Sequence, residues 1–179
     1  MAAGATMYSF QVTLADVDRG VYEDLALRVA RHPSETDAFM LTRLLAYCLE
    51  YTDGIVFSDG ISAAGEPAVY AKDATGALVI WVEVGAPDAA RLHDGSLRSP
   101  RVAVYTHRDP AKVAAPWSGK RIHRSEEISL HSFDPGFIDR ATEALERRTV
   151  VSVSRVEDTL YLELNGWQGQ SALHAQRVS

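Results

Sequence analysis

The chain has little cysteine, no long apolar run and no basic leader. Cys48 is the only cysteine among 179 residues, so neither an internal disulfide nor a cysteine metal cluster can form. No apolar run approaches the roughly 20 residues of a membrane-spanning helix. The N-terminal MAAGATMYSF lacks the basic region and apolar core of a signal peptide. The length predicts one domain, residues 1–179, and we expect a cytoplasmic protein that does not bind a membrane.

Positive charge is also scarce. The net charge is −6 and the pI is about 5.5, which argues against a broad nucleic-acid-binding face. The first 90 residues carry 5 basic and 13 acidic side chains. This acidic half is consistent either with carboxylates gathered around a cation or with a solvated acidic surface.

Hydrophobic periodicity predicts the elements of the first half of the chain. Residues 7–16 and 21–33 alternate between apolar and polar, which indicates an antiparallel strand pair joined across Asp16–Gly20. Ser34, with Asp37 three residues later, predicts the N-terminus of a helix that ends at Asp53-Gly54. Strands are expected at 54–58, 67–73 and 78–84, then a short helix at 88–96 and a strand at 101–106.

The second half predicts fewer regular elements. Residues 109–119 read as a loose segment and 121–130 as a strand. Asp134-Pro135 predicts the start of a helix through Arg148, and residues 149–166 predict a C-terminal β-hairpin. The sequence therefore predicts an α/β (α+β) fold with a mixed β-sheet.

Glu83 interrupts the most apolar stretch of the chain, ALVIWVEVGAP. Both faces of this strand are apolar, as in a central strand that is covered on both sides. A carboxylate there is costly to bury unless it meets a cation or hydrogen-bond donors. Glu83 also stands at the carboxyl end of its strand, where α/β sheets tend to bind ligands. Two interpretations stay open: a site carboxylate, or a strand-end glutamate paired with an arginine such as Arg91.

Three further acids are candidates for the same site. Glu66 precedes the preceding strand, Asp73 ends it, and Glu35 lies in the first turn of the predicted helix. A negative charge at Glu35 is also explained by the helix dipole alone. Carboxylates from a helix and two strands would suit Mg²⁺ or Mn²⁺, and such an ion can orient a phosphate and activate water.

Several segments together resemble one known family. LALRVARHPSETDAFMLTRLLAY, GEPAVYAKD, IWVEVGAPDAARL and the late NGWQ follow the pattern of the YaeQ family along nearly the whole chain. The resemblance implies a variant of the PD-(D/E)XK nuclease-like (restriction-endonuclease-like) fold, with an αβββαβ core. It implies that Glu35 is the helix acid, Asp73 or Glu66 the middle carboxylate and Glu83 the strand acid, all four being candidate ligands of Mg²⁺ or Mn²⁺.

The sequence departs from that pattern at one position. The lysine of (D/E)-x-K is replaced by Gly85, so the site lacks an electrostatic stabiliser. Arg91, His93 or Lys72 are candidate replacements, although arginine is a poor proton acceptor.

Three functions follow from these residues. The first is a Mg²⁺-dependent nuclease or phosphodiesterase that acts on nucleic acid or another phosphodiester, with Glu35, Asp73, Glu83 and Arg91 as catalytic residues. The second is a non-catalytic binding or regulatory protein that retains the scaffold. The third is an enzyme that acts on another small substrate with the same carboxylates.

Overall fold

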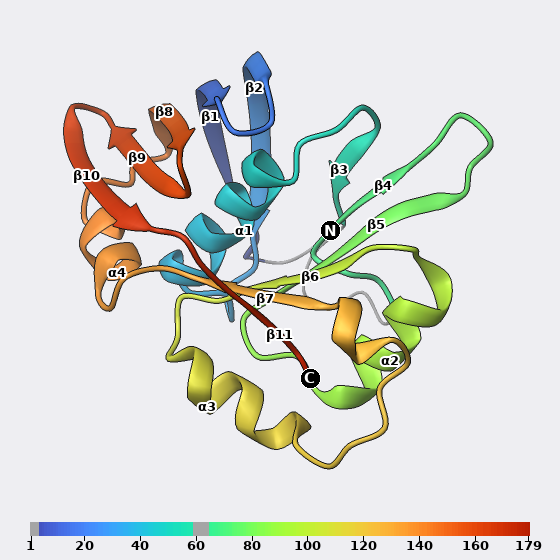
Figure 1. Cartoon of the computed structure of the whole chain (residues 1–179). Coiled ribbons are helices and arrows are strands. Elements are labelled where there is room, and N and C mark those ends of the chain that lie inside the picture. The colour runs from blue at the N-terminus through green and yellow to red at the C-terminus, as the bar shows by residue number, and fades with distance from the viewer. Residues whose placement is uncertain (1–3, 59–64) are drawn as a thin grey trace.

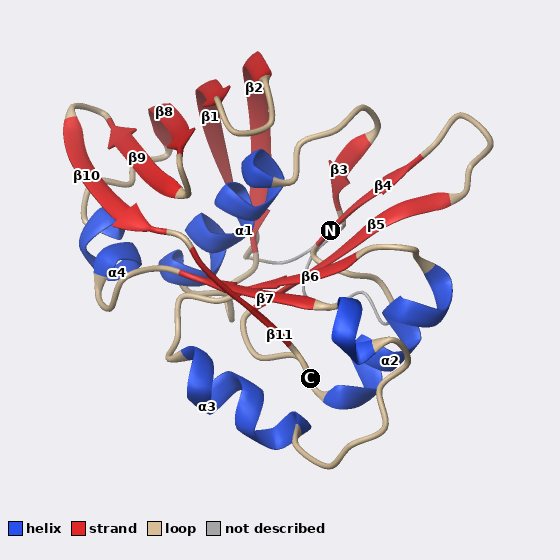
Figure 2. Cartoon of the chain, viewed as in Figure 1, coloured by secondary structure: helices blue, strands red, loops and turns tan. Residues whose placement is uncertain are grey.

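The computed structural model describes residues 4–58 and 65–179, and within them the strands form two mixed sheets (Figures 1 and 2). The five-stranded sheet joins the two ends of the chain, because β1 pairs in parallel with β8 and antiparallel with β2. Its order is β10-β9-β8-β1-β2, with β1 (Thr6–Asp16), β2 (Val21–Arg31), β8 (Arg148–Val156), β9 (Thr159–Leu164) and β10 (Trp167–Ala172).

The six-stranded sheet contains the strand that carries Glu83. Strands β5, β6 and β7 are parallel, whereas β3 and β4 form antiparallel pairs at one side, so β5 is a central strand. The order is β11-β7-β6-β5-β4-β3, with β3 (Ile55–Phe57), β4 (Val69–Lys72), β5 (Leu78–Val84), β6 (Val102–Tyr105), β7 (Ser129–Ser132) and β11 (His174–Arg177).

Helix α1 (Asp37–Leu49) lies between the two sheets (Figure 1). Ten consecutive residues, 40–49, are buried, because the helix is covered by a sheet on each side rather than on one. Its N-cap is Thr36, whose hydroxyl accepts a hydrogen bond from Phe39 N at 3.1 Å. The predicted cap at Ser34 was therefore two residues early, since Ser34 Oγ instead contacts His32 Nδ1 at 2.8 Å.

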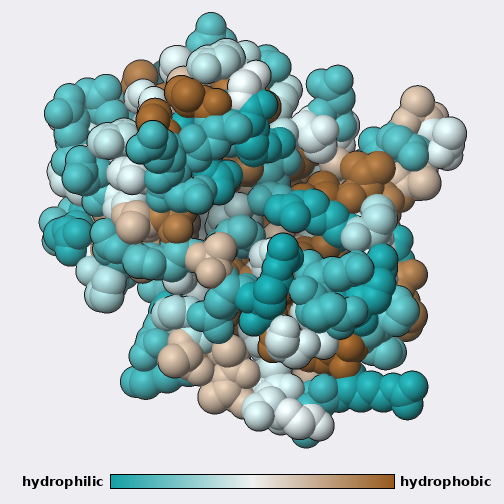
Figure 3. All heavy atoms as spheres, in the orientation of Figure 1, coloured by the Kyte–Doolittle hydropathy of each residue, from teal (hydrophilic) through white to brown (hydrophobic). Residues whose placement is uncertain are grey.

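Helix α2 (Ala89–Arg98) covers the opposite face of the six-stranded sheet, together with α3 (Pro110–Ala114). Alternate residues of β5 therefore enter different cores: Ile80 and Val82 face α1, while Trp81 packs with Leu92 of α2. Both faces of β5 are buried, as its apolar sequence predicted. The surface seen in Figure 3 is mostly hydrophilic, with hydrophobic side chains in separate patches.

The order of helix, three strands, helix and strand over residues 37–105 is confirmed. The hairpin predicted at residues 149–166 is confirmed as β8 and β9, and β10 and β11 follow it. Other details were predicted incorrectly. Residues 109–119 contain α3 and a 3₁₀ turn, Ala115–Trp117, and the strand expected at 121–130 is a 3₁₀ turn, Ser125–Glu127, followed by β7. Helix α4 (Phe137–Thr142) begins after Gly136 and ends well before Arg148, because β8 starts there and pairs with β1. The strands form two sheets rather than one.

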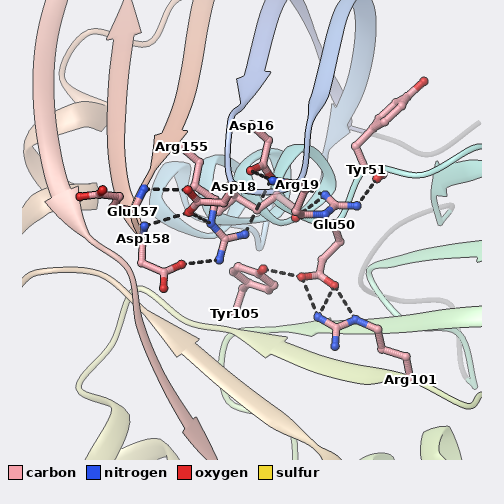
Figure 4. A network of polar contacts seen from close by, with 11 residues as sticks. Asp16, Asp18, Arg19, Glu50, Tyr51, Arg101, Tyr105, Arg155, Glu157 and Asp158 are labelled. Carbon is pink, nitrogen blue, oxygen red and sulfur yellow. Dashed lines mark hydrogen bonds and ion pairs between the residues drawn. The ribbon is translucent and has the colours of Figure 1, made fainter.

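A polar network joins the facing sides of the two sheets (Figure 4). Glu50, at the end of α1, accepts hydrogen bonds from the Arg101 guanidinium at 2.7–3.1 Å and from the Tyr105 hydroxyl at 2.7 Å. The fully buried Asp16 lies 3.6 Å from Arg19 and 3.8 Å from Arg155.

Within residues 4–58 and 65–179, no helix is both long enough and apolar enough to cross a bilayer.

The free energy of unfolding should depend on pH through His131. The His131 ring stacks on Tyr105 of the network, with 4.5 Å between the ring centroids. Burial lowers the pKa of the imidazole to about 4. The pKa is depressed in the folded state, so this group stabilises the fold above its unfolded pKa near 6.5, and that stability is lost as the pH falls through 4. Between pH 6.5 and pH 4 we expect wild type to lose up to about 3 kcal/mol more stability than His131→Phe. Urea unfolding across that pH range measures the difference, and parallel curves for the two proteins would contradict it.

Candidate functional site

The carboxylate of Glu83 is buried, with 5% of the residue exposed, and both of its oxygens accept hydrogen bonds. Trp81 Nε1 donates to Oε2 at 2.7 Å. Arg91 donates from Nε to Oε1 at 3.0 Å and from Nη2 to Oε2 at 3.2 Å. The pairing with Arg91, one of the two interpretations of the sequence, is therefore present. This two-point contact is the strong geometry for an arginine and a carboxylate.

The start of α2 brings Arg91 to Glu83. Asp88 caps the helix, because its Oδ1 accepts from Arg91 N at 2.9 Å. Gly95 permits the close approach of the helix to β5: a Cβ at this position would lie 2.8 Å from Trp81 Nε1. The hydrogen bonds to Glu83 raise the pKa of Arg91, so its guanidinium is charged throughout the physiological range.

A cleft of about 290 Å³ opens at the carboxyl end of β5. Phe39 and Arg43 of α1 line one side of the cleft, and Glu66, Glu83 and Arg91 line the other. Arg91 Nη2 also donates to the backbone carbonyl of Glu66 at 2.6 Å, which ties the guanidinium to the cleft wall. Helices on opposite faces of the sheet therefore contribute one arginine each to the same cleft.

Glu35 lies behind Arg43 and is 3% exposed. Its Oε1 is 2.8 Å from Arg43 Nη2, and its Oε2 accepts from Arg43 Nη2 at 3.1 Å and from His32 N at 3.2 Å. Burial raises the pKa of the Glu35 carboxyl, although the charge of Arg43 acts in the opposite direction. Burial also lowers the pKa of Arg43. Glu35 therefore positions Arg43, and Arg43 reaches the cleft.

Asp73 does not join the cleft. It stands at the turn between β4 and β5. From Leu78, where β5 begins, to Glu83 the strand runs five residues, or about 17 Å. Its Oδ1 accepts from Thr75 Oγ1 at 2.5 Å, Thr75 N at 2.9 Å and Ala77 N at 3.1 Å. The Thr75 hydroxyl is the largest cause of its lowered pKa. Of the two candidate middle carboxylates, Glu66 is the one that lines the cleft.

Gly85 has φ +94°, and a Cβ there would lie 3.1 Å from the Phe39 ring. A lysine at this position would therefore be strained and would crowd α1. Among the proposed replacements, Arg91 contacts Glu83, whereas Lys72 lies 5.8 Å over the Tyr70 ring and His93 Nδ1 accepts from His123 N. The cation at Glu83 thus comes from the helix that follows the strand.

The residues of the cleft do not fit a divalent metal ion. The donors of Trp81 and Arg91 already occupy both oxygens of Glu83, and Glu35 is paired with Arg43. Across residues 4–58 and 65–179, no three His, Cys, Asp or Glu side chains stand close enough to hold a metal together. A metal at Glu83 would first have to displace Arg91.

Two residues that complete this arrangement were missed from the sequence. Trp81 was recognised as apolar only, although its position two residues before Glu83 puts both side chains on one face of β5. Arg43 stands eight residues after Glu35, and an arginine within an otherwise apolar helical stripe was the available signal. The Cys48 thiol is buried, which raises its pKa to about 12, so it is not a reactive nucleophile at neutral pH.

The fold and the cleft define an α+β protein in which buried glutamates hold arginines at the carboxyl end of a central strand. Residues 1–172 match the family model described as "YaeQ protein". A relative from Escherichia coli (strain K12), "Uncharacterized protein YaeQ", is 30% identical over 96% of this chain and 100% of its own length. The chain belongs to the YaeQ family, as its sequence segments indicated.

Two solved structures share the fold. The YaeQ protein of Pseudomonas syringae has a TM-score of 0.84 and 30% identity, with 97% of this chain and 96% of that chain covered. The YaeQ protein of Xanthomonas axonopodis pv. citri has a TM-score of 0.87 and 24% identity, with 97% and 98% covered.

From the ion pair between Glu83 and Arg91 we predict whether Glu83→Gln raises or lowers the free energy of unfolding. Glu83→Gln removes the charge that Arg91 faces, and because Arg91 is 37% exposed the stranded guanidinium remains partly hydrated. We expect the free energy of unfolding to fall by about 1–3 kcal/mol, measured by urea unfolding without metal. Glu66→Gln is the matched control, since Glu66 contributes its backbone carbonyl to Arg91, and it should change stability by less than about 0.5 kcal/mol. A more stable Glu83→Gln would instead indicate repulsion between carboxylates.

Proposed function

We propose that this chain is a non-catalytic binding protein whose cleft at the end of β5 recognises a phosphate or phosphodiester group. One observation carries the proposal: Glu83 engages Arg91 through Nε and Nη2. These contacts and the Glu66 carbonyl account for three of the five N–H groups of the guanidinium. Both hydrogens on Nη1 lack a hydrogen-bond partner among the described residues, and the side chain lines the cleft.

The chemistry of arginine suits this role. A carboxylate that fixes the orientation of a guanidinium reduces the conformational entropy that the arginine side chain loses when a ligand binds. The spacing of the remaining N–H donors matches that of phosphate oxygens. Arg43 of α1 also lines the cleft, where it is 2% exposed and paired with Glu35. The acidic chain, with a net charge of −6, favours a local contact with one or two phosphates over a long duplex-binding surface.

The same residues are consistent with a PD-(D/E)XK-like fold that no longer hydrolyses phosphodiesters. In that interpretation the αβββαβ order of residues 37–105 is the nuclease-like core, Glu83 is the strand acid, and Arg91 has taken the place next to it that a lysine would fill. An arginine there binds phosphate but does not accept a proton from water. The scaffold would then serve recognition alone.

The first test removes the guanidinium. We expect Arg91→Gln to weaken binding of a short single-stranded DNA by about 10- to 100-fold, the loss of charged hydrogen bonds, and to reduce the salt dependence by about one phosphate contact. Fluorescence anisotropy at several salt concentrations measures both. Arg140→Gln, on the exposed side of α4, is the control. The double variant Glu83→Gln with Arg91→Gln leaves no stranded charge and should bind as weakly as Arg91→Gln. Equal affinity of wild type and Arg91→Gln would contradict the proposal.

A second candidate, a Mg²⁺- or Mn²⁺-dependent phosphodiesterase, is favoured by one observation: Glu66 and Glu83 line the same cleft. It requires Arg91 to leave Glu83 so that a metal can reach the carboxylate. The two candidates differ in what Glu83 does, because a metal enzyme needs its charge and a phosphate-binding protein needs it only to orient Arg91.

Metal addition separates them. We expect Mg²⁺ and Mn²⁺ to leave the thermal unfolding midpoint unchanged in wild type and in Glu83→Gln, because a ligand stabilises a protein only if it binds the native state. A mixed pool of single- and double-stranded DNA should remain uncut. A rise in the midpoint of wild type that Glu83→Gln abolishes, together with cleavage of the pool, would establish the metal enzyme instead.

A further inference from the structure

A second set of side chains lies beside the cleft on the same face of the β4–β5 hairpin. Tyr70 of β4 is directly opposite Trp81 of β5, and Glu83 follows Trp81 by two residues. Successive side chains on one face of a strand are about 6–7 Å apart. The row therefore runs from the cleft at Glu83, past Trp81 and Tyr70, to Lys72.

Arg98 of α2 covers this row. Its guanidinium carbon lies 4.9 Å from the centroid of the Trp81 ring, and Nη1 donates to the carbonyl of Gly65 at 2.8 Å. One face of the guanidinium is therefore fixed against Trp81, while the residue stays exposed to solvent. Tyr70, Lys72 and Leu78 border the same small hollow, as do Glu66 and Pro67, which also line the cleft at Arg91. The two depressions therefore share a wall made by Glu66 and Pro67.

Packing alone explains part of this arrangement, since a cation over an aromatic ring stabilises a surface. It does not explain why Lys72 and Arg98 border this hollow and Arg91 lines the neighbouring cleft in a chain whose net charge is −6. A fixed guanidinium plane beside an aromatic ring is a surface on which unstacked bases bind. The neighbouring positive charges would attract the phosphates that link those bases.

We propose that this hollow is a base-binding subsite: a nucleotide of a single-stranded nucleic acid places its phosphate at Arg91 and stacks its base on Arg98 and Tyr70. The inference rests on the phosphate recognition proposed above and adds the class of ligand. A simple phosphate or a sugar phosphate would use Arg91 alone. A duplex would present no free base face to Arg98, because its bases are stacked on one another.

The test compares two single strands of equal length that carry the same phosphates, one with bases and one abasic throughout. Wild type should bind the strand with bases about tenfold more tightly, as expected for one stacked base. Arg98→Lys keeps the charge but loses the planar surface. The variant should therefore bind the two strands with nearly equal affinity. Tyr70→Leu should act in the same direction without touching a charge. Arg140→Lys is the matched control and should keep the full preference.

Arg91→Gln separates the two proposals. It should weaken binding of both strands by the same factor, so that the ratio of the two affinities stays unchanged. If wild type binds the two strands equally, the base subsite is excluded while phosphate recognition stands. A preference that survives in both Arg98→Lys and Tyr70→Leu also excludes it. Tighter binding of a duplex than of the single strand overturns the inference as well. Failure of wild type to bind either strand overturns phosphate recognition itself, and with it this subsite.

Discussion

The arrangement at the end of β5 depends on one requirement: a carboxylate buried between sheet and helix must be met by donors. Glu83 satisfies it with Trp81 from its own strand and Arg91 from α2. The contact with Arg91 requires α2 to lie close against β5, which Gly95 permits by having no side chain to collide with Trp81. The cleft and the orientation of Arg91 follow from this packing. The hydrogen bonds that make burial of Glu83 tolerable also decide which groups remain available to a ligand.

The same principle operates on the other wall. Glu35 is buried and paired with Arg43, so that two of the three glutamates predicted as metal ligands have an arginine partner instead. A buried ion pair adds little stability over an apolar pair of similar size, so stability is a weak reason for having two of them at one cleft. Orientation of the arginines is the stronger explanation. It accounts for Glu35 and Glu83, each of which holds an arginine that lines the cleft.

Local patterns predicted the first half of the fold well, because period-two alternation and a helical stripe survive wherever burial is regular. They also predicted a central β5 and an arginine partner for Glu83. They failed where distant segments decide the structure: β8 pairs with β1 across about 140 residues, which shortens α4 and divides the strands into two sheets. Asp73 was grouped with Glu83 because the two acids flank adjacent strands, but an antiparallel hairpin sends the β4–β5 turn to the far end. Nothing in the sequence indicated that Tyr70 lies opposite Trp81, because that position depends on strand register.

The glycine at position 85 and the contact of Arg91 with Glu83 have a common physical explanation. At position 85 the backbone has φ +94°, and the Phe39 ring is 3.1 Å from where a Cβ would lie. The turn between β5 and α2 therefore leaves no room for a side chain at this position. A cation for Glu83 can then come only from a neighbouring element, and the first turn of α2 is the nearest one. An arginine on a helix reaches the carboxylate with Nε and Nη2 and still has Nη1 to offer, which a single ammonium group could do less well. It gains a second contact for an anion and gives up proton transfer. Under the function proposed above, this geometry would serve recognition of a phosphate rather than its hydrolysis.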